Sequence, residues 1–435
     1  MISIETSQLH LVSKDGWQKW KLAHAFQLIG SGTTPPTSNV EYFQGVIPWV
    51  NTGDLNDKYI KSVNKCVSVK AVNDFPTLKI YPKGSIIIAL YGATIGKLGI
   101  LQIDACTNQA CCILAQSIYL DTKFVFYWLM SERSNIIKLA HGGGQPNISQ
   151  EIVKNLRILA PAIDKQKAIA SFLDRKTAAI DTLIAKKQRL IQLLEEKRTA
   201  LINQAVTKGL NLNVPMKDSG IPWIGEIPEH WDIKRIGYIS QVVRGASPRP
   251  AGDQKYFDGD AHPWITVGEI TKDQKMYLTE TETFLTELGC QQSRLIPKGT
   301  LLLSNSGATL GVPKIIAISG CINDGSVALF DISKQVDKEF IYFVFTSMTN
   351  LLRDRLYQGS GQPNLNTDLV KAIRFSCPPL EEQIKIVSRL KAQIHKNYLI
   401  LAKQFDQIEK LQEYRQSLIT AAVTGKIDIR EEVAA

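Results

Sequence analysis

Residues 164–209 read DKQKAIASFLDRKTAAIDTLIAKKQRLIQLLEEKRTALINQAVTKG, and this stretch organises the rest of the chain. It contains no proline, and its only glycine, Gly209, is its last residue. Its apolar residues recur at helical spacing, and four of them share one seven-residue register: Leu173, Ile180, Leu194 and Leu201. The pattern predicts a single helix of about 67 Å, at a rise of about 1.5 Å per residue, with Gly209 as its stop.

A second stretch of the same kind, residues 380–425, lies near the end of the sequence. Its seven-residue register holds Val387, Ile394, Leu401 and Ile408. LEEKRTALINQAVT from Leu194 matches LQEYRQSLITAAVT from Leu411. Each apolar stripe either packs on its own globular domain or pairs with the other stripe. The repeat and the length favour pairing, so we expect an antiparallel coiled coil.

The segments between the helices also repeat. PWVNTGDL from Pro48 matches PWITVGEI from Pro263, and GATIG from Gly92 matches GATLG from Gly307. The spacing between the copies is nearly constant, shortest where Trp17 matches Trp231 and longest where Leu194 matches Leu411. One unit present twice implies a pseudo-two-fold internal repeat rather than an open solenoid.

The repeat predicts four parts of the chain. They are a first globular domain (1–160), a first long helix (161–213), a second globular domain (214–377, with a linker at 210–231) and a second long helix with a tail (378–435). Residues 210–231 are rich in Pro and Gly without periodicity, which predicts a linker with Trp223 and Trp231 as its packing residues.

The globular parts are predicted as mixed α/β (α+β) domains. IIIAL after Gly84 and LLLS after Gly299 are continuous apolar runs of the kind found in buried strands. Residues 123–140 and 338–356 show the helical period with aromatic side chains, which predicts two amphipathic helices.

Composition limits the class of protein only loosely. The chain has 435 residues, 44% of them apolar, and a net charge of +10. The basic first half suits a polyanionic partner, but residues 214–435 are neutral, with 26 basic and 26 acidic groups, so charge is a weak argument. The seven cysteines form no CxxC pattern and are expected to be reduced core thiols of a cytoplasmic protein. No apolar run reaches the length of a signal or a membrane span, so no membrane partner is expected.

Catalytic motifs are absent from the sequence. GATIGKLG at Gly92 approaches a phosphate-binding loop, but it has three residues between the glycines instead of four, and Leu98 follows Lys97. A hairpin or tight turn is the favoured interpretation. No Asn/Asp-Pro-Pro-aromatic tetrapeptide of a DNA adenine methyltransferase occurs, and the six histidines do not cluster. We therefore expect a binding protein without catalytic residues, metal or cofactor of its own.

Candidate DNA-binding residues come from two kinds of loop. The Gly-rich loops hold Gln145, Asn147, Gln362 and Asn364, whose amides could pair with adenine. Because both copies share Gln-Pro-Asn, a role in holding the loop backbone is favoured for these four. Sequence readout is expected where the copies diverge, at residues 33–39 against 247–253 and 51–58 against 266–274. The candidates there are Thr33, Thr34, Asn51, Thr52 and Lys58 in the first copy and Arg244, Ser247, Arg249, Thr266 and Lys272 in the second.

Over nearly its whole length, the chain resembles the specificity subunit of type I restriction–modification enzymes. The marks are PWIGEIPEHW (222–231), LAPAIDKQKAIASFLD (159–174), LEEKRTALINQAVTKGL (194–210) and the matching segments near the C-terminus. One departure is that the first half lacks the IPWIGEIPEHW lead-in and has only Trp17 and Trp20 there.

The resemblance implies two target recognition domains, each of which binds one half of a split site in double-stranded DNA. The paired helices would set the spacing of the half-sites and dock two DNA-methyltransferase subunits, which motor–nuclease subunits join. S-adenosylmethionine, ATP and Mg²⁺ would bind to those partners and not to this chain. The resemblance also implies a prokaryotic cytoplasmic location.

Overall fold

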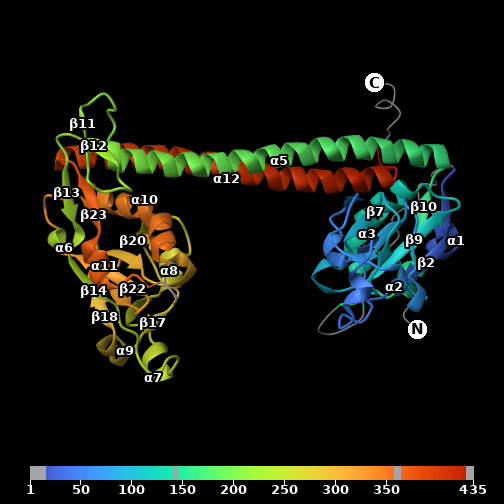
Figure 1. Ribbon diagram of the computed structural model, residues 1–435, viewed down its shortest axis with the longest axis horizontal. Helices are drawn as coiled ribbons and strands as arrows, with labels where there is room; N and C mark the ends of the chain where they lie inside the picture. Colours follow the sequence, from blue (N-terminus) through green and yellow to red (C-terminus); the bar gives the residue numbers. More distant parts are fainter. Residues whose placement is uncertain (1–15, 141–145, 357–363, 428–435) are drawn as a thin grey trace. The chain divides into compact units, whose positions relative to one another are not determined.

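The computed structural model describes residues 16–140, 146–356 and 364–427. The chain divides into two compact units. The first unit comprises Met1–Lys187 and Asp406–Ala435, and the second comprises Gln188–Phe405. Each unit contains one globular domain and a part of each long helix (Figure 1).

The two long helices are continuous. Helix α5 (Ile163–Lys208) has 46 residues and α12 (Leu380–Val423) has 44, which confirms both predicted helices. Gly209 and Gly425 follow their ends with φ of +76° and +65°. Glycine enters this left-handed region without a Cβ clash, so both glycines act as helix stops.

The helices run antiparallel in each unit. In the first unit, Arg415 Nε of α12 donates to Asp181 Oδ1 of α5 at 2.9 Å, and Lys187 Nζ donates to Gln407 Oε1 at 2.5 Å. In the second unit, Asn397 Nδ2 donates to the carbonyl oxygen of Leu194 at 3.1 Å. Within the first unit, a higher number on α5 thus pairs with a lower number on α12, as the predicted antiparallel coiled coil requires (Figure 1).

The predicted pairing residues differ in burial. Leu173, Ile180 and Val387 are buried, whereas Leu194, Leu201, Ile394, Leu401 and Ile408 are half-buried. Leu173 belongs to the core of the first globular domain and also clusters with Ile419 of α12. Packing on the globular domain and packing between helices are therefore both present, although the sequence presented them as alternatives.

The first globular domain is built on a five-stranded sheet and a three-stranded sheet. The large sheet has the order β2 (Phe26–Ser31), β9 (Cys111–Ser117), β6 (Ile86–Ala89), β7 (Leu98–Leu101) and β4 (Lys58–Ile60). The small sheet has the order β5 (Cys66–Val67), β3 (Ile47–Val50) and β8 (Cys106–Thr107), and β1 (Gln18–Lys21) pairs with β10 (Arg157–Ala160). The helical segments are α1 (Leu22–Ala25), η1 (Val40–Phe43), η2 (Thr52–Asp54), α2 (Val69–Asp74), η3 (Gly92–Thr94), α3 (Thr122–Lys138) and α4 (Gln150–Asn155).

The second globular domain repeats this plan. Its large sheet has the order β14 (Gln241–Arg244), β22 (Ser326–Phe330), β19 (Leu301–Ser304), β20 (Pro313–Ile316) and β16 (Tyr277–Leu278). Its smaller sheet has the order β17 (Phe284–Leu285), β15 (His262–Ile265), β21 (Gly320–Ile322) and β18 (Arg294–Ile296), and β13 (Asp232–Arg235) pairs with β23 (Arg374–Cys377). The helical segments are α6 (Ile236–Ile239), α7 (Gln254–Phe257), α8 (Val267–Thr271), α9 (Glu287–Gln292), η4 (Gly307–Thr309), α10 (Lys338–Leu356) and α11 (Thr367–Ala372).

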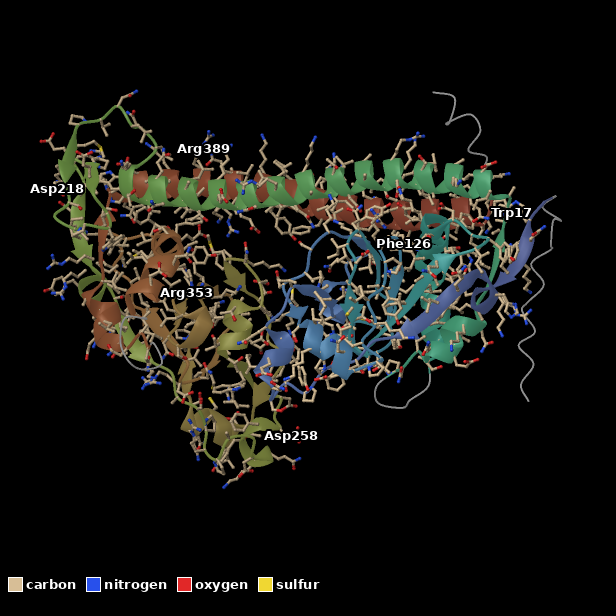
Figure 2. All side chains as sticks on the ribbon, turned by 45° about the vertical axis from the view of Figure 1, so that its right-hand side comes forward. Trp17, Phe126, Asp218, Asp258, Arg353 and Arg389 are labelled. Carbon is tan, nitrogen blue, oxygen red and sulfur yellow. The ribbon has the colours of Figure 1, made fainter. Side chains whose placement is uncertain are left out.

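Each large sheet is covered on both faces, which explains the continuous apolar strands. Ile86 and Ile88 of β6 join the cluster that contains α3 and the start of α5, whereas Ile87 and Ala89 face the opposite cluster. Successive side chains of a strand point to opposite faces, so a strand covered on both sides needs apolar residues throughout. Phe126 of α3, which Figure 2 labels, belongs to the cluster that contains α5. The predicted strands and the helices at 123–140 and 338–356 are confirmed.

The strand registers show that the spacing of the repeat varies more than the sequence matches indicated. Ser31 pairs with Cys112 and Arg244 with Val327, so Ser31 corresponds to Arg244, a shorter spacing than that of Trp17 and Trp231. Tyr59 pairs with Ile100 and Tyr277 with Ile315, so Tyr59 corresponds to Tyr277, a longer spacing than that of Leu194 and Leu411. The predicted range was too narrow because insertions and deletions lie in the divergent loops, where the sequences carry no common pattern.

The predicted linker at 210–231 contains a small hairpin. Strand β11 (Met216–Asp218) pairs antiparallel with β12 (Glu226–Pro228), and Trp231 is fully buried in the second core. The three-residue strands are too short to show a period of two in the sequence, which is why the segment read as irregular. The segment is thus an ordered part of the second unit.

Candidate DNA-binding loops

Polar side chains gather where β2, β3 and β8 of the first domain end. We call Thr33, Thr34, Asn51, Asn108 and Gln109 the first loop cluster. The Thr34 hydroxyl donates to Gln109 Oε1 at 2.5 Å, and Asn108 Nδ2 donates to Asn51 Oδ1 at 3.4 Å. The structure thus brings together three of the predicted residues from two divergent segments.

Close backbone contact holds this cluster on the sheet. The Thr33 N–H donates to the carbonyl oxygen of Thr107 at 3.0 Å. A Cβ on Gly32 would lie 1.7 Å from the same oxygen, so only glycine fits there. Thr107 Oγ1 and Asn108 Oδ1 are buried without a hydrogen-bond partner in the structure. Unpaired buried oxygens cost free energy in the folded state.

The second domain has an equivalent group, Arg244, Ser247, Arg249, Asn323 and Asp324, which we call the second loop cluster. Ser247 Oγ donates to Asp324 Oδ1 at 2.6 Å, and Arg249 Nη2 donates to Asp324 Oδ2 at 3.1 Å. Arg244 Nε donates to the Asp324 carbonyl oxygen at 2.9 Å. All three predicted residues of this segment therefore converge on one aspartate.

The two clusters share equivalent positions that carry different chemistry. By strand register, Thr34 corresponds to Ser247 and Gln109 to Asp324. The first pair is neutral, and the second is charged. The hydrogen bond from Ser247, together with the positive charge of Arg249, lowers the pKa of Asp324 although burial opposes this. Asp324 is thus held ionised beside an arginine whose side chain is 69% exposed.

The other divergent candidates lie outside the two clusters. Thr52 lies in η2, and Lys58 begins β4 with an exposed side chain. Thr266 caps α8, since its hydroxyl accepts from the Glu269 N–H at 3.4 Å. Lys272 Nζ lies 2.6 Å from Glu269 Oε2, an ion pair that raises the pKa of Lys272.

The Gln-Pro-Asn loops meet the hairpins of the large sheets. Asn147 forms an isolated bridge with Tyr91, and Asn364 forms one with Ser306. Both Asn side chains are exposed. The backbones of Asn147 and Asn364 are thus held by the large sheets while their side chains stay accessible. Gln145 and Gln362 lie outside the described residues.

Sequence reasoning missed four residues of the two clusters. Asn108 and Asn323 match each other in the repeat but are not among the predicted residues, and neither are their neighbours Gln109 and Asp324. The useful pattern was a polar pair inside an apolar run, at the turns between β8 and β9 and between β21 and β22. Thr34-Pro35 and Ser247-Pro248 were a second available match, and they would have aligned the two clusters correctly.

The phosphate-loop alternative is excluded by the backbone. η3 (Gly92–Thr94) connects β6 to β7, and the Gly96 N–H donates to the Ala89 carbonyl oxygen at 2.9 Å. A phosphate loop leads into a helix, whereas this turn closes an antiparallel hairpin, as predicted. Within the described residues, no group of three or more His, Cys, Asp or Glu side chains could hold a metal ion. None of the helices in this part of the chain combines the length and apolar character that a membrane span requires.

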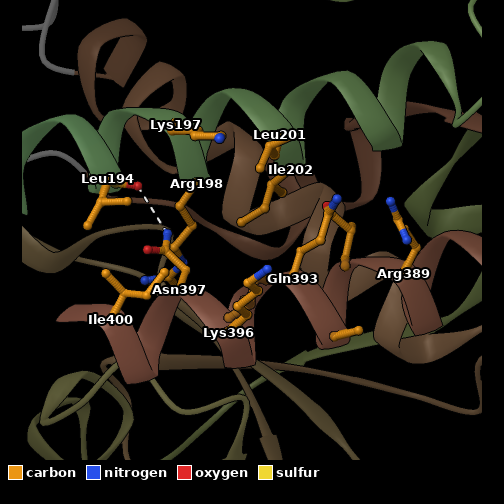
Figure 3. Close-up of a pocket in the computed structure, with 13 residues that line it drawn as sticks. Leu194, Lys197, Arg198, Leu201, Ile202, Arg389, Gln393, Lys396, Asn397 and Ile400 are labelled. Carbon is orange, nitrogen blue, oxygen red and sulfur yellow. Dashed lines mark hydrogen bonds between the residues drawn. The ribbon is translucent and has the colours of Figure 1, made fainter. Parts of the chain in front are cut away.

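The helix pair of the second unit opens into a groove of about 400 Å³. Leu194, Leu201 and Ile394 of the predicted seam line it together with four basic side chains: Lys197, Arg198, Arg389 and Lys396 (Figure 3). Lys197 interrupts the apolar row of α5, so the seam cannot close with apolar side chains alone at this level. The contact from Asn397 to Leu194 crosses the groove instead (Figure 3).

Known proteins share both the sequence pattern and the fold. A family model described as type I restriction modification DNA specificity domain matches residues 14–193 and 228–410. The specificity subunit of the type I restriction enzyme MjaVIII of Methanocaldococcus jannaschii is 23% identical over 432 residues, which cover 96% of this chain and 94% of that one. The EcoKI specificity subunit of Escherichia coli is 22% identical over 345 residues, 75% of this chain and 70% of that one.

Two solved structures have the same fold. A chain from a structure of a type I R-M system has a TM-score of 0.67 and 17% identity, over 94% of this chain and 98% of that one. The HsdS subunit from Thermoanaerobacter tengcongensis has a TM-score of 0.54 and 16% identity, over 95% and 98%. The family model covers two separate segments, one for each globular domain. The chain therefore belongs to the type I restriction–modification DNA specificity family, as a specificity subunit with two target recognition domains.

Proposed function

We propose that each loop cluster binds one half of a split DNA site. The observation that carries this proposal is the chemical divergence of two clusters that occupy equivalent places on a shared scaffold. Gln109 offers a neutral amide of the type that pairs with adenine, whereas Arg249 offers a guanidinium of the type that pairs with guanine. Two half-sites of different sequence require such a difference.

In this proposal, α5 and α12 set the distance between the half-sites. An unbroken helix of 46 residues is about 69 Å long and transmits a fixed spacing. Spacing that follows from protein geometry is the general rule for proteins that bind two half-sites.

The long helices are also the proposed docking surface for two DNA-methyltransferase subunits, which motor–nuclease subunits join. Support comes from large apolar side chains that the helices leave exposed in each unit. Leu183 and Tyr414 are 43% and 57% exposed in the first unit, and Tyr398 and Phe405 are 64% and 58% exposed in the second. Exposed apolar groups of this size are typical of protein interfaces. S-adenosylmethionine, ATP and Mg²⁺ would bind to those partners, and the catalysis would be theirs.

The decisive experiment is to co-express the chain with the methyltransferase subunit of its operon and to map methylated adenines in the host genome. We expect a motif with two defined half-sites and a gap of fixed length. Purified complex without a split motif would contradict the proposal and leave a scaffold role.

A matched insertion tests the spacing. Because Lys187 faces Gln407, seven residues inserted after Ala185 are balanced by seven after Glu409. Two added helical turns are about 10 Å, or about three base pairs. We expect the gap to lengthen by about that amount with both half-sites unchanged. Altered half-sites at an unchanged gap would be incompatible with a helical spacer.

A further inference from the structure

An ion pair joins the first globular domain to the long helix that follows it. Lys123 Nζ of α3 lies 2.6 Å from Asp174 Oδ2 of α5. The Tyr59 hydroxyl of β4 donates to Asp174 Oδ1 at 3.0 Å. Burial is the main cause that raises the pKa of Tyr59, so its hydroxyl stays protonated and able to donate. We call Tyr59, Lys123 and Asp174 the first junction.

The second globular domain meets α12 through the three equivalent elements, β16, α10 and α12. Lys391 Nζ of α12 lies 3.0 Å from Glu339 Oε1 of α10 and 3.1 Å from its Oε2. The Tyr277 hydroxyl of β16 donates to Glu339 Oε1. Tyr277, Glu339 and Lys391 form the second junction.

Three independent contacts show that the two junctions occupy equivalent places. Tyr59 and Tyr277 pair with Ile100 and Ile315, which match in the repeat. Lys123 and Glu339 each lie two residues after an aspartate. The side chain of that aspartate accepts a hydrogen bond from a backbone N–H at the start of the helix, which is α3 in the first domain and α10 in the second. Asp174 and Lys391 each lie eight residues after a buried glutamine that accepts from the backbone N–H of that aspartate.

The charges at these equivalent places are reversed. In the first junction the globular domain supplies the cation and the long helix the anion, whereas in the second the globular domain supplies the anion. The tyrosine follows the carboxylate in both. The glutamines beside the junctions do not differ in this way, because Gln166 and Gln383 bridge helix and domain with the same pair of hydrogen bonds. The first junction has one further donor, since the Tyr127 hydroxyl donates to Asp174 Oδ1 at 2.8 Å and its counterpart is Phe343.

We propose that this reversal matches each globular domain to its own long helix, with Lys123 and Glu339 restricting exchange of a domain between the two positions. If the first domain stood on α12, Lys123 would face Lys391. If the second domain stood on α5, Glu339 would face Asp174. Each exchange thus replaces an ion pair by two like charges. With the first domain on α12, Tyr59 would have no carboxylate acceptor. With the second domain on α5, Tyr277 would lie beside two carboxylates instead of one. Both carboxylates are partly buried, with 26% of Asp174 and 16% of Glu339 exposed, so water screens these charges only in part.

Chimeric chains test the proposal. Residues 232–377 are replaced by a second copy of residues 18–160, because Asp232 and Cys377 pair as Gln18 and Ala160 do. This chimera is compared with the same chimera carrying Lys391→Asp, each co-expressed with the methyltransferase subunit. We expect the Lys391→Asp chimera to methylate sites with two copies of the first half-site about tenfold more than the unmodified chimera. Equal methylation by the two chimeras overturns the proposal, and so does equal absence of methylation if hydrogen exchange shows both copies folded and docked alike.

Variants of the natural chain provide a second test that does not depend on chimera folding. Lys123→Glu should loosen the first domain on α5, seen as several-fold faster hydrogen exchange in α3, and adding Asp174→Lys should restore protection. Lys138→Glu, on the exposed end of α3, is the matched charge control: Lys123 is intact in that background, so adding Asp174→Lys should speed exchange in α3 rather than restore protection. The lack of any rescue in the double variant contradicts the proposal. Methylation as a readout rests on the proposed function, but hydrogen exchange does not, so the two can fail separately.

Discussion

The two loop clusters differ in chemistry while their supports agree. In the first, Thr34 and Gln109 meet through a neutral hydrogen bond. In the second, Ser247 and Arg249 meet the ionised Asp324. Each cluster lies beside a glycine, Gly32 or Gly245, that is too close to a neighbouring backbone for any larger residue. A fixed frame with a few free positions lets recognition change while the fold is retained.

A second difference lies beside the small strands β4 and β16. In the first domain, Gly99 of β7 leaves room for Ile60, since a Cβ there would lie 2.6 Å from the Ile60 side chain. The equivalent residue in β20 is Lys314, which is 1% exposed. Its Nζ lies 2.5 Å from Asp273 Oδ1 and 2.8 Å from the Lys275 carbonyl oxygen. One domain fills this place with an aliphatic side chain and the other with a buried cation.

The largest expected effect follows from removing the partner of that cation. Asp273→Ala should destabilise the second domain by about 3 kcal/mol, because it leaves a buried ammonium without its carboxylate. This is the low end of the range for a buried pair, since Asp273 is 33% exposed. Faster hydrogen exchange in β16 and β20, with β4 and β7 unchanged, is the measurement.

Lys314→Met is the matched control for Asp273→Ala. It removes the charge and keeps the aliphatic stem, so we expect a change within about 1 kcal/mol. If Lys314→Met proved as damaging as Asp273→Ala, the stability would come from the ion pair itself, and the comparison with Gly99 would lose its basis.

A smaller effect is expected at the loop clusters. Asp324→Ala releases both Ser247 and Arg249, and we expect about tenfold weaker discrimination at the second half-site, within the range of one lost base contact. Gln109→Ala releases only Thr34 and should weaken discrimination at the first half-site by a smaller factor. Mapping methylated adenines for each variant measures both halves at once. Each variant serves as the control for the other, and a loss at the opposite half-site would reverse the assignment.

The sequence predicted the scaffold well because the scaffold is repetitive and apolar. The helices from Ile163 and Leu380 and the buried strands at Ile86 and Leu301 each carry a period or an apolar run that one-dimensional reasoning can detect. The antiparallel pairing followed from the match of LEEKRTAL with LQEYRQSL.

The loop contacts could be predicted only in part. Thr34, Ser247 and Arg249 were found because the copies diverge there, but their partners Gln109 and Asp324 lie 75 or more residues away along the chain. Only the strand pairing of β2 with β9 and of β14 with β22 brings them together. The charge reversal at the junctions could not be predicted from the sequence for the same reason, since each side chain of a junction comes from a different element.

The smallest expected effect is a pH dependence confined to the second loop cluster. The pKa of Asp324 is lowered, so its ionised form stabilises the folded loops above the ordinary aspartate pKa of about 3.9. That contribution is lost as the pH falls through the lowered pKa of the folded state. We expect the protection of β21 and β22 against hydrogen exchange to exceed that of Asp324→Asn by a constant factor from pH 8 to pH 5, and the factor to decline only below about pH 4, as the pH approaches the lowered pKa of the folded state. Gln109 does not titrate, so the first domain should show no such change, and Gln109→Glu should introduce one there because Thr34 would then donate to a carboxylate. A factor for Asp324 that already falls between pH 8 and pH 5 would mean that the aspartate is not held ionised by Ser247 and Arg249.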